Sequence, residues 1–94
     1  MYISLKDRFR SSIKYFRFKN KLSQEQLAEL ADLTEKYISD VERGRATPSF
    51  DTVDRIAEAF EVDSLELLTD KYYEEYANNK IKIDKVRGRI KRGK

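Results

Sequence analysis

The stretch SQEQLAELADLTEKYISDVERGR, residues 23–45, holds two short apolar stripes at helical spacing, with only five residues between them. The stripes are formed first by Leu27, Leu30 and Ala31, and then by Tyr37, Ile38 and Val41. Apolar residues that recur at steps of three and four indicate amphipathic helices. The stretch therefore predicts two helices held close together, the second of which carries polar side chains of many kinds on its other side.

Helix-boundary signals flank both stripes. Ser23 precedes Gln26 by three residues, which is the spacing of a capping box, and Thr34 is the candidate N-cap of the next helix. Gly44 follows the second stripe and predicts its end, because Gly readily adopts the left-handed conformation. Ser4 is a candidate cap for a preceding helix.

Three further helices are predicted outside this stretch. Their apolar positions are Leu5, Phe9, Ile13 and Phe16; then Phe50, Val53, Ile56, Ala57 and Phe60, after a cap at Thr47 or Ser49; then Leu65, Leu67 and Leu68, after Asp63 or Ser64. Five helices with short joints and no strand signal predict a compact all-α domain over residues 5–69. Residues 70–94 are predicted to be a C-terminal extension, in which KIKI at 80–83 alternates like a strand and residues 85–94 form a basic tail.

Composition narrows the class of protein. A chain of 94 residues favours one domain, and it contains no Cys and no His. The longest unbroken apolar run, residues 1–3, is far shorter than the roughly 18 residues of a membrane span. With no visible secretory signal, a cytoplasmic, nucleoid-associated protein is expected.

Charge is divided by region. Residues 1–21 carry seven basic and one acidic side chain, residues 22–69 four and twelve, and residues 70–94 nine and four, so the net charges are +6, −8 and +5. Basic ends suggest a polyanion partner, because Lys and Arg displace counterions from phosphate. The alternative is that these charges merely solvate the surface.

The segment LSQEQLAELADLTEKYISDVERGRATPSFDTVDRIAEAF, residues 22–60, resembles the helix-turn-helix regulators of the lambda repressor and Cro type, the XRE family. With Ile13, Phe16 and Arg17 before it, the match covers roughly residues 9–68. Asp32 and Glu61 stand where the family usually has Gly. A left-handed conformation at each costs on the order of 1 kcal/mol, which such a fold tolerates.

The resemblance implies a bracing helix and a reading helix that enters the major groove. Its candidate base-reading residues are Thr34, Glu35, Lys36, Ser39 and Asp40. Its candidate phosphate contacts are Gln24, Tyr37, Arg43, Arg45, Thr47 and Ser49. Tyr37 or Ile38 is expected to face the core with Val41, and Asp40 either reads a base or borders the groove.

Arg17 and Glu42 match family positions that are commonly joined in a buried, structural ion pair. Aromatic residues away from the core stripes gather at both ends, among them Tyr15 and Phe18 in the first helix and Tyr72 and Tyr76 in the extension. They suggest that the C-terminal segment packs on the first helix or on a second subunit; the alternative is loosely ordered tyrosines.

The function expected from the resemblance is a sequence-specific regulator of transcription, a repressor or autoregulator similar to controller proteins. It would bind double-stranded DNA at a near-palindromic operator as a homodimer. The fifth helix and the extension are the expected dimer interface. The alternative is an antitoxin or protein-interaction module whose partner binds residues 70–94. Catalysis is not expected, because His, Cys and a Gly-rich phosphate loop are missing, and neither a cofactor nor a metal is expected.

Overall fold

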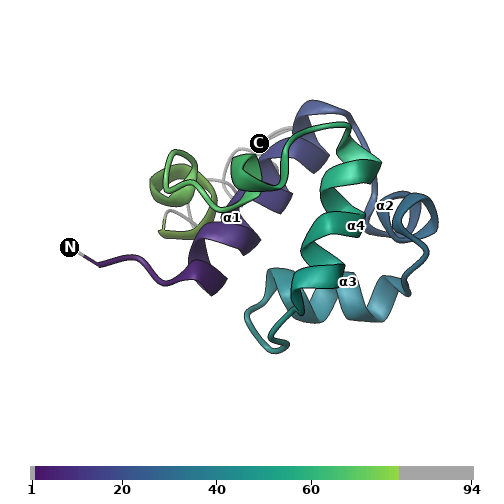
Figure 1. The fold of residues 1–94 in the computed structure, drawn as a ribbon, viewed down its shortest axis with the longest axis horizontal. Coiled ribbons are helices and arrows are strands. Elements are labelled where there is room, and N and C mark those ends of the chain that lie inside the picture. Colours follow the sequence, from purple (N-terminus) through teal and green to yellow (C-terminus); the bar gives the residue numbers. More distant parts are fainter. Residues whose placement is uncertain (1, 79–94) are drawn as a thin grey trace, which may run out of the picture.

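The computed structural model describes residues 2–78, and all regular structure in that part of the chain is helical. The elements are α1 (Leu5–Lys19), α2 (Gln24–Ala31), α3 (Glu35–Glu42), α4 (Phe50–Phe60), the 3₁₀ turn η1 (Ser64–Leu67) and the π-helical turn η2 (Glu74–Asn78) (Figure 1). This confirms the all-α class, with η1 at the place of the predicted fifth helix. The strand-like segment 80–83 and the basic tail lie outside the described residues.

Side-chain caps fix where the helices begin. In each α-helix the residue before the first turn accepts a hydrogen bond from the backbone N–H three positions later; these caps are Ser4, Ser23, Thr34 and Ser49. The Gln26 side chain in turn accepts a hydrogen bond from the Ser23 backbone N–H, which completes the predicted capping box. Asp63 caps η1. Short polar side chains therefore set these boundaries locally, before any packing is considered.

Two helices end at left-handed residues that are not Gly. Asp32 closes α2 at φ 59° and Glu61 closes α4 at φ 60°, the two positions singled out in the sequence. The backbone N–H groups of the residues that follow, Leu33 and Val62, bond to carbonyls in the last turn of each helix and offset part of the strain. Gly44, at φ 77°, follows α3 as predicted.

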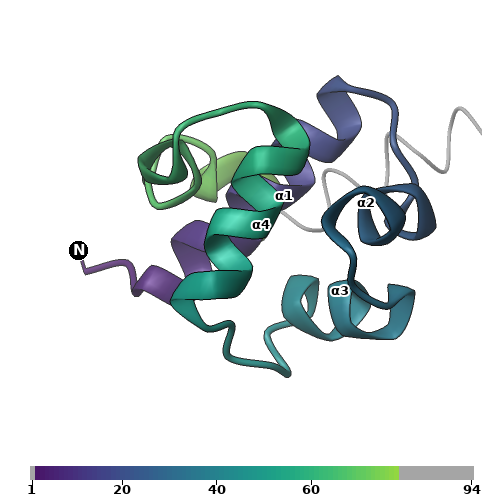
Figure 2. The ribbon, with the colours of Figure 1, turned by 45° about the vertical axis from the view of Figure 1, so that its right-hand side comes forward.

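The core lies where α1, α2, α3 and α4 converge (Figure 2). Its members that are entirely removed from solvent are Ile13, Leu27, Ile38, Val41, Ile56 and Leu67. Among residues 2–78, no helix is both long and apolar enough to cross a bilayer.

Four apolar residues that the stripes assigned to the buried faces are exposed instead. They are Leu5, Leu30, Phe50 and Leu65, with exposed fractions of 55%, 59%, 83% and 73%. Leu5 and Phe50 are the first residues of their helices and project past the neighbouring elements. Leu30 lies roughly 100° around α2 from the centre of its buried arc. In η1, Leu67 takes the inward position, so Leu65 points outward.

The described part of the extension packs on α1 through an aromatic cluster, which we call the aromatic clasp: Tyr15, Phe16, Phe18, Tyr72 and Tyr76. Tyr72 stacks on Tyr15 with ring centroids 3.9 Å apart and meets the edge of Phe16 at 5.7 Å. Tyr76 contacts Tyr15 and Phe18 edge-on at 5.7 and 5.9 Å. Tyr72 and Tyr76 thus pack on the first helix of the same chain, which is one of the two arrangements that the sequence suggested.

The aromatic clasp raises the pKa of two phenols above their usual value. Burial is the main cause at both Tyr72 and Tyr76; Lys71 partly opposes it at Tyr72, and Glu75 reinforces it at Tyr76. A folded-state pKa above the unfolded value means that the unfolded chain loses its proton first as pH rises. The stability that these shifts contribute is therefore complete below the unfolded-state pKa of about 10 and is lost as pH rises through the higher folded-state pKa.

We expect the clasp to release at alkaline pH, and Tyr72→Phe to weaken that response because the ring stays while the ionising hydroxyl is removed. Urea unfolding at pH 8 and at about pH 10.5 measures the change in free energy of unfolding. Tyr2→Phe, at an 82% exposed tyrosine, is the control and should keep the wild-type pH response. Equal alkaline losses in the wild type and Tyr72→Phe would contradict the assignment.

Candidate nucleic-acid interface

Helix α3 has a buried side and a solvent-exposed side. Ile38 and Val41 are entirely buried, whereas Tyr37 is half-buried at the edge of the core. Ile38 is thus the main inward residue of the two that the sequence left open. The predicted base-reading residues all lie on the other side: Thr34, Glu35 and Lys36 are exposed, and Ser39 and Asp40 are partly exposed.

Helix α2 holds α3 through a very short turn. Residues 32–34 join the two helices, and the Leu33 N–H donates to the Ala28 carbonyl at 2.8 Å while its side chain packs on the core. From α4, Arg55 donates to the Asp32 carbonyl at 3.3 Å. Figure 2 shows α2 and α3 as adjacent rods at a steep angle to one another. This is the helix-turn-helix arrangement, in which the first helix sets the attitude of the second.

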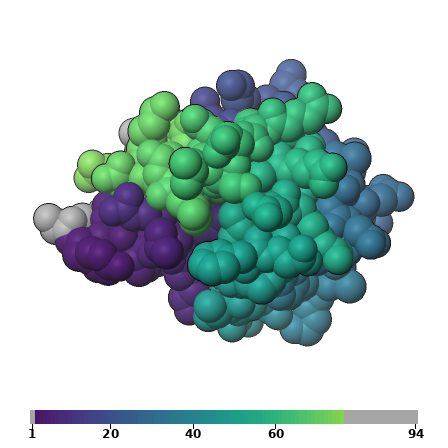
Figure 3. All heavy atoms as spheres, in the orientation of Figure 1, coloured from purple at the N-terminus to yellow at the C-terminus, as the bar shows by residue number. Residues whose placement is uncertain are grey.

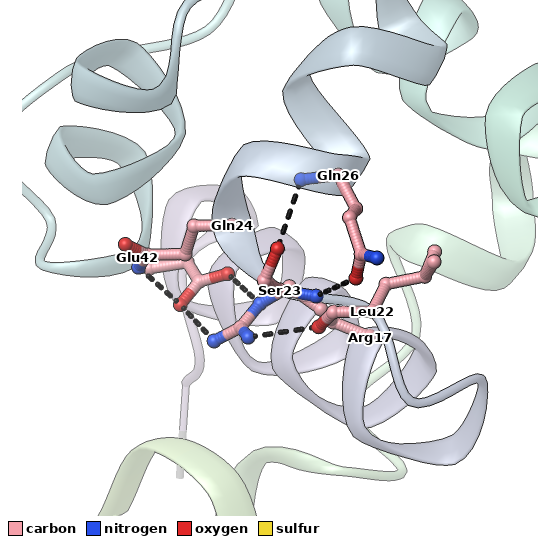
Figure 4. A network of polar contacts seen from close by, with 6 residues as sticks. All are labelled: Arg17, Leu22, Ser23, Gln24, Gln26 and Glu42. Carbon is pink, nitrogen blue, oxygen red and sulfur yellow. Dashed lines mark hydrogen bonds and ion pairs between the residues drawn. The ribbon is translucent and has the colours of Figure 1, made fainter.

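Arg17 and Glu42 join α1 to α3 by a two-point contact (Figure 4). Arg17 Nε donates to Glu42 Oε2 at 2.8 Å and Nη2 donates to Oε1 at 2.9 Å. Their side chains are 10% and 3% exposed. Arg17 Nη1 also donates to the Leu22 carbonyl at 3.1 Å, immediately before α2. One guanidinium thus connects α1, the entry to α2 and the end of α3.

Gln24 is tied to the same carboxylate. Its Nε2 donates to Glu42 Oε1 at 3.1 Å, across 18 positions of sequence (Figure 4). The bond occupies one of the two amide N–H groups and leaves the second for an external acceptor. The sequence suggested Gln24 and Glu42 separately; their contact was missed because no local pattern relates residues so far apart.

The exposed side of α3 contains an ion pair between two base-reading candidates. Lys36 Nζ lies 2.9 Å from Asp40 Oδ2, one helical turn away, and the two side chains are 84% and 26% exposed. Thr34 accepts the Tyr37 N–H as a cap, so its hydroxyl can still donate outward. Glu35 stands at the first residue of the helix.

The loop from α3 to α4 presents two cations beside Gly44. Arg43, Arg45 and Thr47 are all exposed, and the Arg45 N–H donates to the Asp40 carbonyl at 2.7 Å, which fixes the start of the loop. Ser49 is engaged internally: its hydroxyl caps α4 and donates to Thr52 Oγ1 at 3.1 Å. The loop's exposed donors are therefore concentrated before Ser49.

Residues 13–67 match the helix-turn-helix family HTH_3. The chain belongs to this family. The match begins in α1, contains both helices of the helix-turn-helix and ends at η1. It thus includes Arg17, Gln24 and Glu42.

Two proteins with similar sequences are a phage immunity repressor and a bacterial control protein. The immunity repressor protein of Bacillus phage phi105 is 47% identical over 47 residues, which are 50% of this chain and 33% of the repressor. Control protein C.BamHI of Bacillus amyloliquefaciens is 44% identical over 50 residues, or 53% of this chain and 62% of that protein. The chain therefore spans less than two thirds of either relative.

A solved structure shares the fold. The restriction–modification controller protein C.AhdI from Aeromonas hydrophila superimposes with a TM-score of 0.63 at 32% identity, over 66% of this chain and 94% of C.AhdI. At that coverage nearly the whole controller corresponds to about two thirds of this chain.

Removal of the Glu42 carboxylate should destabilise the fold strongly. Glu42→Ala leaves the Arg17 charge buried without its partner, which costs about 3–5 kcal/mol. Chemical denaturation measures the loss. Asp51→Ala, which removes the carboxylate of an exposed pair with Arg55, is the matched control and should cost less than about 1 kcal/mol.

A joint Arg17→Met, Glu42→Leu substitution removes both charges and should recover most of the loss. If Glu42→Ala cost no more than Asp51→Ala, the buried pair would have no special structural role.

Proposed function

We propose that this chain is a sequence-specific, double-stranded DNA-binding regulator of transcription, a repressor or autoregulator similar to controller proteins. The observation that carries the proposal is that α3 has two different sides. Ile38 and Val41 bury one side in the core, and the polar residues from Thr34 to Asp40 leave the other side open to solvent. The short turn from α2 holds the helix at a fixed angle. A major groove about 12 Å wide admits one such helix. The repressor and controller names of the relatives support the same role.

In this proposal the solvent-exposed side of α3 contacts the edges of the bases. Lys36 donates to guanine O6 or N7, Glu35 accepts from cytosine N4, and Ser39 does either. Asp40 is joined to Lys36 in the free protein, so the two act together. A site that satisfies Lys36 but places an acceptor against Asp40 is rejected by repulsion, which adds selectivity.

Phosphate contacts orient the reading helix without reading sequence. The free amide N–H of Gln24 and the first backbone N–H groups of α2 face one phosphate, favoured by the positive end of the helix dipole. Arg43, Arg45 and Thr47 face another from the α3–α4 loop. The Tyr37 hydroxyl and the Ser49 segment supply smaller contacts between them.

Selection from random duplexes tests the reading role. The wild type should enrich a two-fold symmetric, near-palindromic site containing guanine, and Lys36→Ala should lose discrimination at that position by about 1–3 kcal/mol, or five- to 150-fold. Lys71→Ala removes the same charge from an exposed lysine beside Tyr72 and should select the wild-type site. Failure of the wild type to enrich any site, with binding that depends on salt alone, would refute the reading role.

The proposal includes a homodimer in the cytoplasm, on the nucleoid. One α3 spans only a few base pairs, whereas two copies about 34 Å apart reach successive major grooves on one face of a duplex. η1 is the candidate two-fold surface, because Leu65 is 73% exposed there while its neighbour Leu67 is entirely buried. The extension, residues 70–94, is the further candidate for the interface or for a protein partner.

Leu65→Glu should shift the chain from dimer to monomer, because an isologous interface places the new charge near its own copy. Sedimentation equilibrium measures the mass, and operator affinity should fall with it. Leu30→Glu, a charge introduced at a similarly exposed leucine on α2, is the control for oligomeric state and should remain dimeric. An unchanged dimer in Leu65→Glu would exclude η1 as the interface.

A further inference from the structure

A basic face of α1 points toward α3. With 3.6 residues per turn, Lys6, Arg10 and Arg17 fall within roughly 40° of one another around the helix axis. Arg17 reaches Glu42 at the end of α3. Lys6 and Arg10 lie two to three turns earlier on the same face, at the level of the loop that follows α3.

Lys6 and Arg10 pack against that loop at Gly44. Lys6 Nζ donates to the Gly44 carbonyl at 3.2 Å. The Arg10 Cδ and Nε atoms lie 3.9 Å from where a Cβ on Gly44 would stand. The first turn of α1 lies beside the loop in both ribbon views, and the purple start of the chain borders teal residues in the space-filling view (Figure 3). Gly44 is flanked by the exposed Arg43 and Arg45.

We propose that Lys6, Arg10, Arg43 and Arg45 form one cationic ridge that binds the DNA backbone beyond the reading helix. The ridge rests on the proposed function and adds α1 to the surface that contacts phosphate. It gives a role to the basic amino-terminal end.

The charges and donors of the ridge suit a phosphate. Arg10 Nε pairs with Asp7 Oδ1 at 2.8 Å, so the ridge holds four cations against that one carboxylate. Asp7 occupies one of the five N–H donors of Arg10, and Gly44 one of the three on Lys6, so donors remain on both side chains. Both side chains are half-buried and already held in place by hydrogen bonds to Gly44 and Asp7. They therefore lose less conformational entropy when they bind a phosphate.

The same helix offers a matched control on its other side. Lys19 lies roughly 180° around α1 from the centre of the Lys6–Arg10 face. Its ammonium lies 5.8 Å from the centre of the Tyr15 ring, and that of Lys71 lies 5.7 Å from the centre of the Tyr72 ring, so both lysines contact the aromatic clasp and not the loop at Gly44. Lys19→Gln with Lys71→Gln removes two charges, as Lys6→Gln with Arg10→Gln does.

Salt dependence of duplex binding tests the ridge. For Lys6→Gln, Arg10→Gln, the slope of log K against log salt should fall by about two for each bound protomer, and so by nearly four for the dimer, relative to the wild type. Between about 50 and 200 mM salt the wild-type dimer should therefore lose roughly 150-fold more affinity than this variant. The loss at low salt should be similar for the selected site and for a random duplex, because phosphate contacts carry no sequence information. Lys6→Arg, Arg10→Lys keeps the charges and should keep the wild-type slope.

The outcomes separate the ridge from the wider proposal. If the wild type selects a site and the folded Lys6→Gln, Arg10→Gln variant keeps its slope, the ridge is wrong while the regulator stands. A fall no larger than that of the Lys19→Gln, Lys71→Gln control also overturns the ridge, because it would reflect net charge alone. If the wild type binds no duplex, both proposals fail.

Discussion

The buried pair between Arg17 and Glu42 is the contact on which the orientation of α3 depends. The pair connects α1, α2 and α3. The Arg17 guanidinium also donates to the Leu22 carbonyl, and the Glu42 carboxylate also accepts from Gln24. Such a pair is strong only when each donor and acceptor is satisfied, since desolvation of the two charges opposes it. Here the geometry is two-point, the Leu22 carbonyl accepts a further bond from Arg17, and Gln24 donates a further bond to Glu42.

This constraint matters because α2 and α3 are only eight residues long. Helices of that length are marginal in water and take their stability from packing and caps. Ile38 and Val41 supply the packing of α3, and Thr34 supplies its cap. The polar side of α3 is not needed for these stabilising contacts, and in the proposed function it is the side that reads DNA.

On the other side of α1, the aromatic clasp fastens residues 72–76 to the domain. Stacked and edge-on rings contribute more than their buried area alone. α1 thus stands between two surfaces of different character. The side facing α3 carries the cations proposed to bind phosphate, and the side facing η2 carries Tyr15 and binds the extension.

Local sequence determined the helices. Caps at Ser4, Ser23, Thr34 and Ser49 and apolar steps of three and four depend only on residues within one turn of each other, so they could be read directly. The same periodicity predicted which side of α3 faces solvent, including Lys36 and Asp40. Which of these residues read bases stays a prediction, because periodicity gives the direction of a side chain and not its ligand.

Tertiary structure decided which apolar residues are buried and which distant polar groups meet. Phe50 and Leu65 fit their stripes yet lie in solvent, because a helix end is covered only if another element reaches it. The bond from Gln24 to Glu42 and the bond from Lys6 to Gly44 span 18 and 38 positions. Contacts at such separations are set by how whole helices pack, and a pattern confined to one helix carries no record of its neighbours.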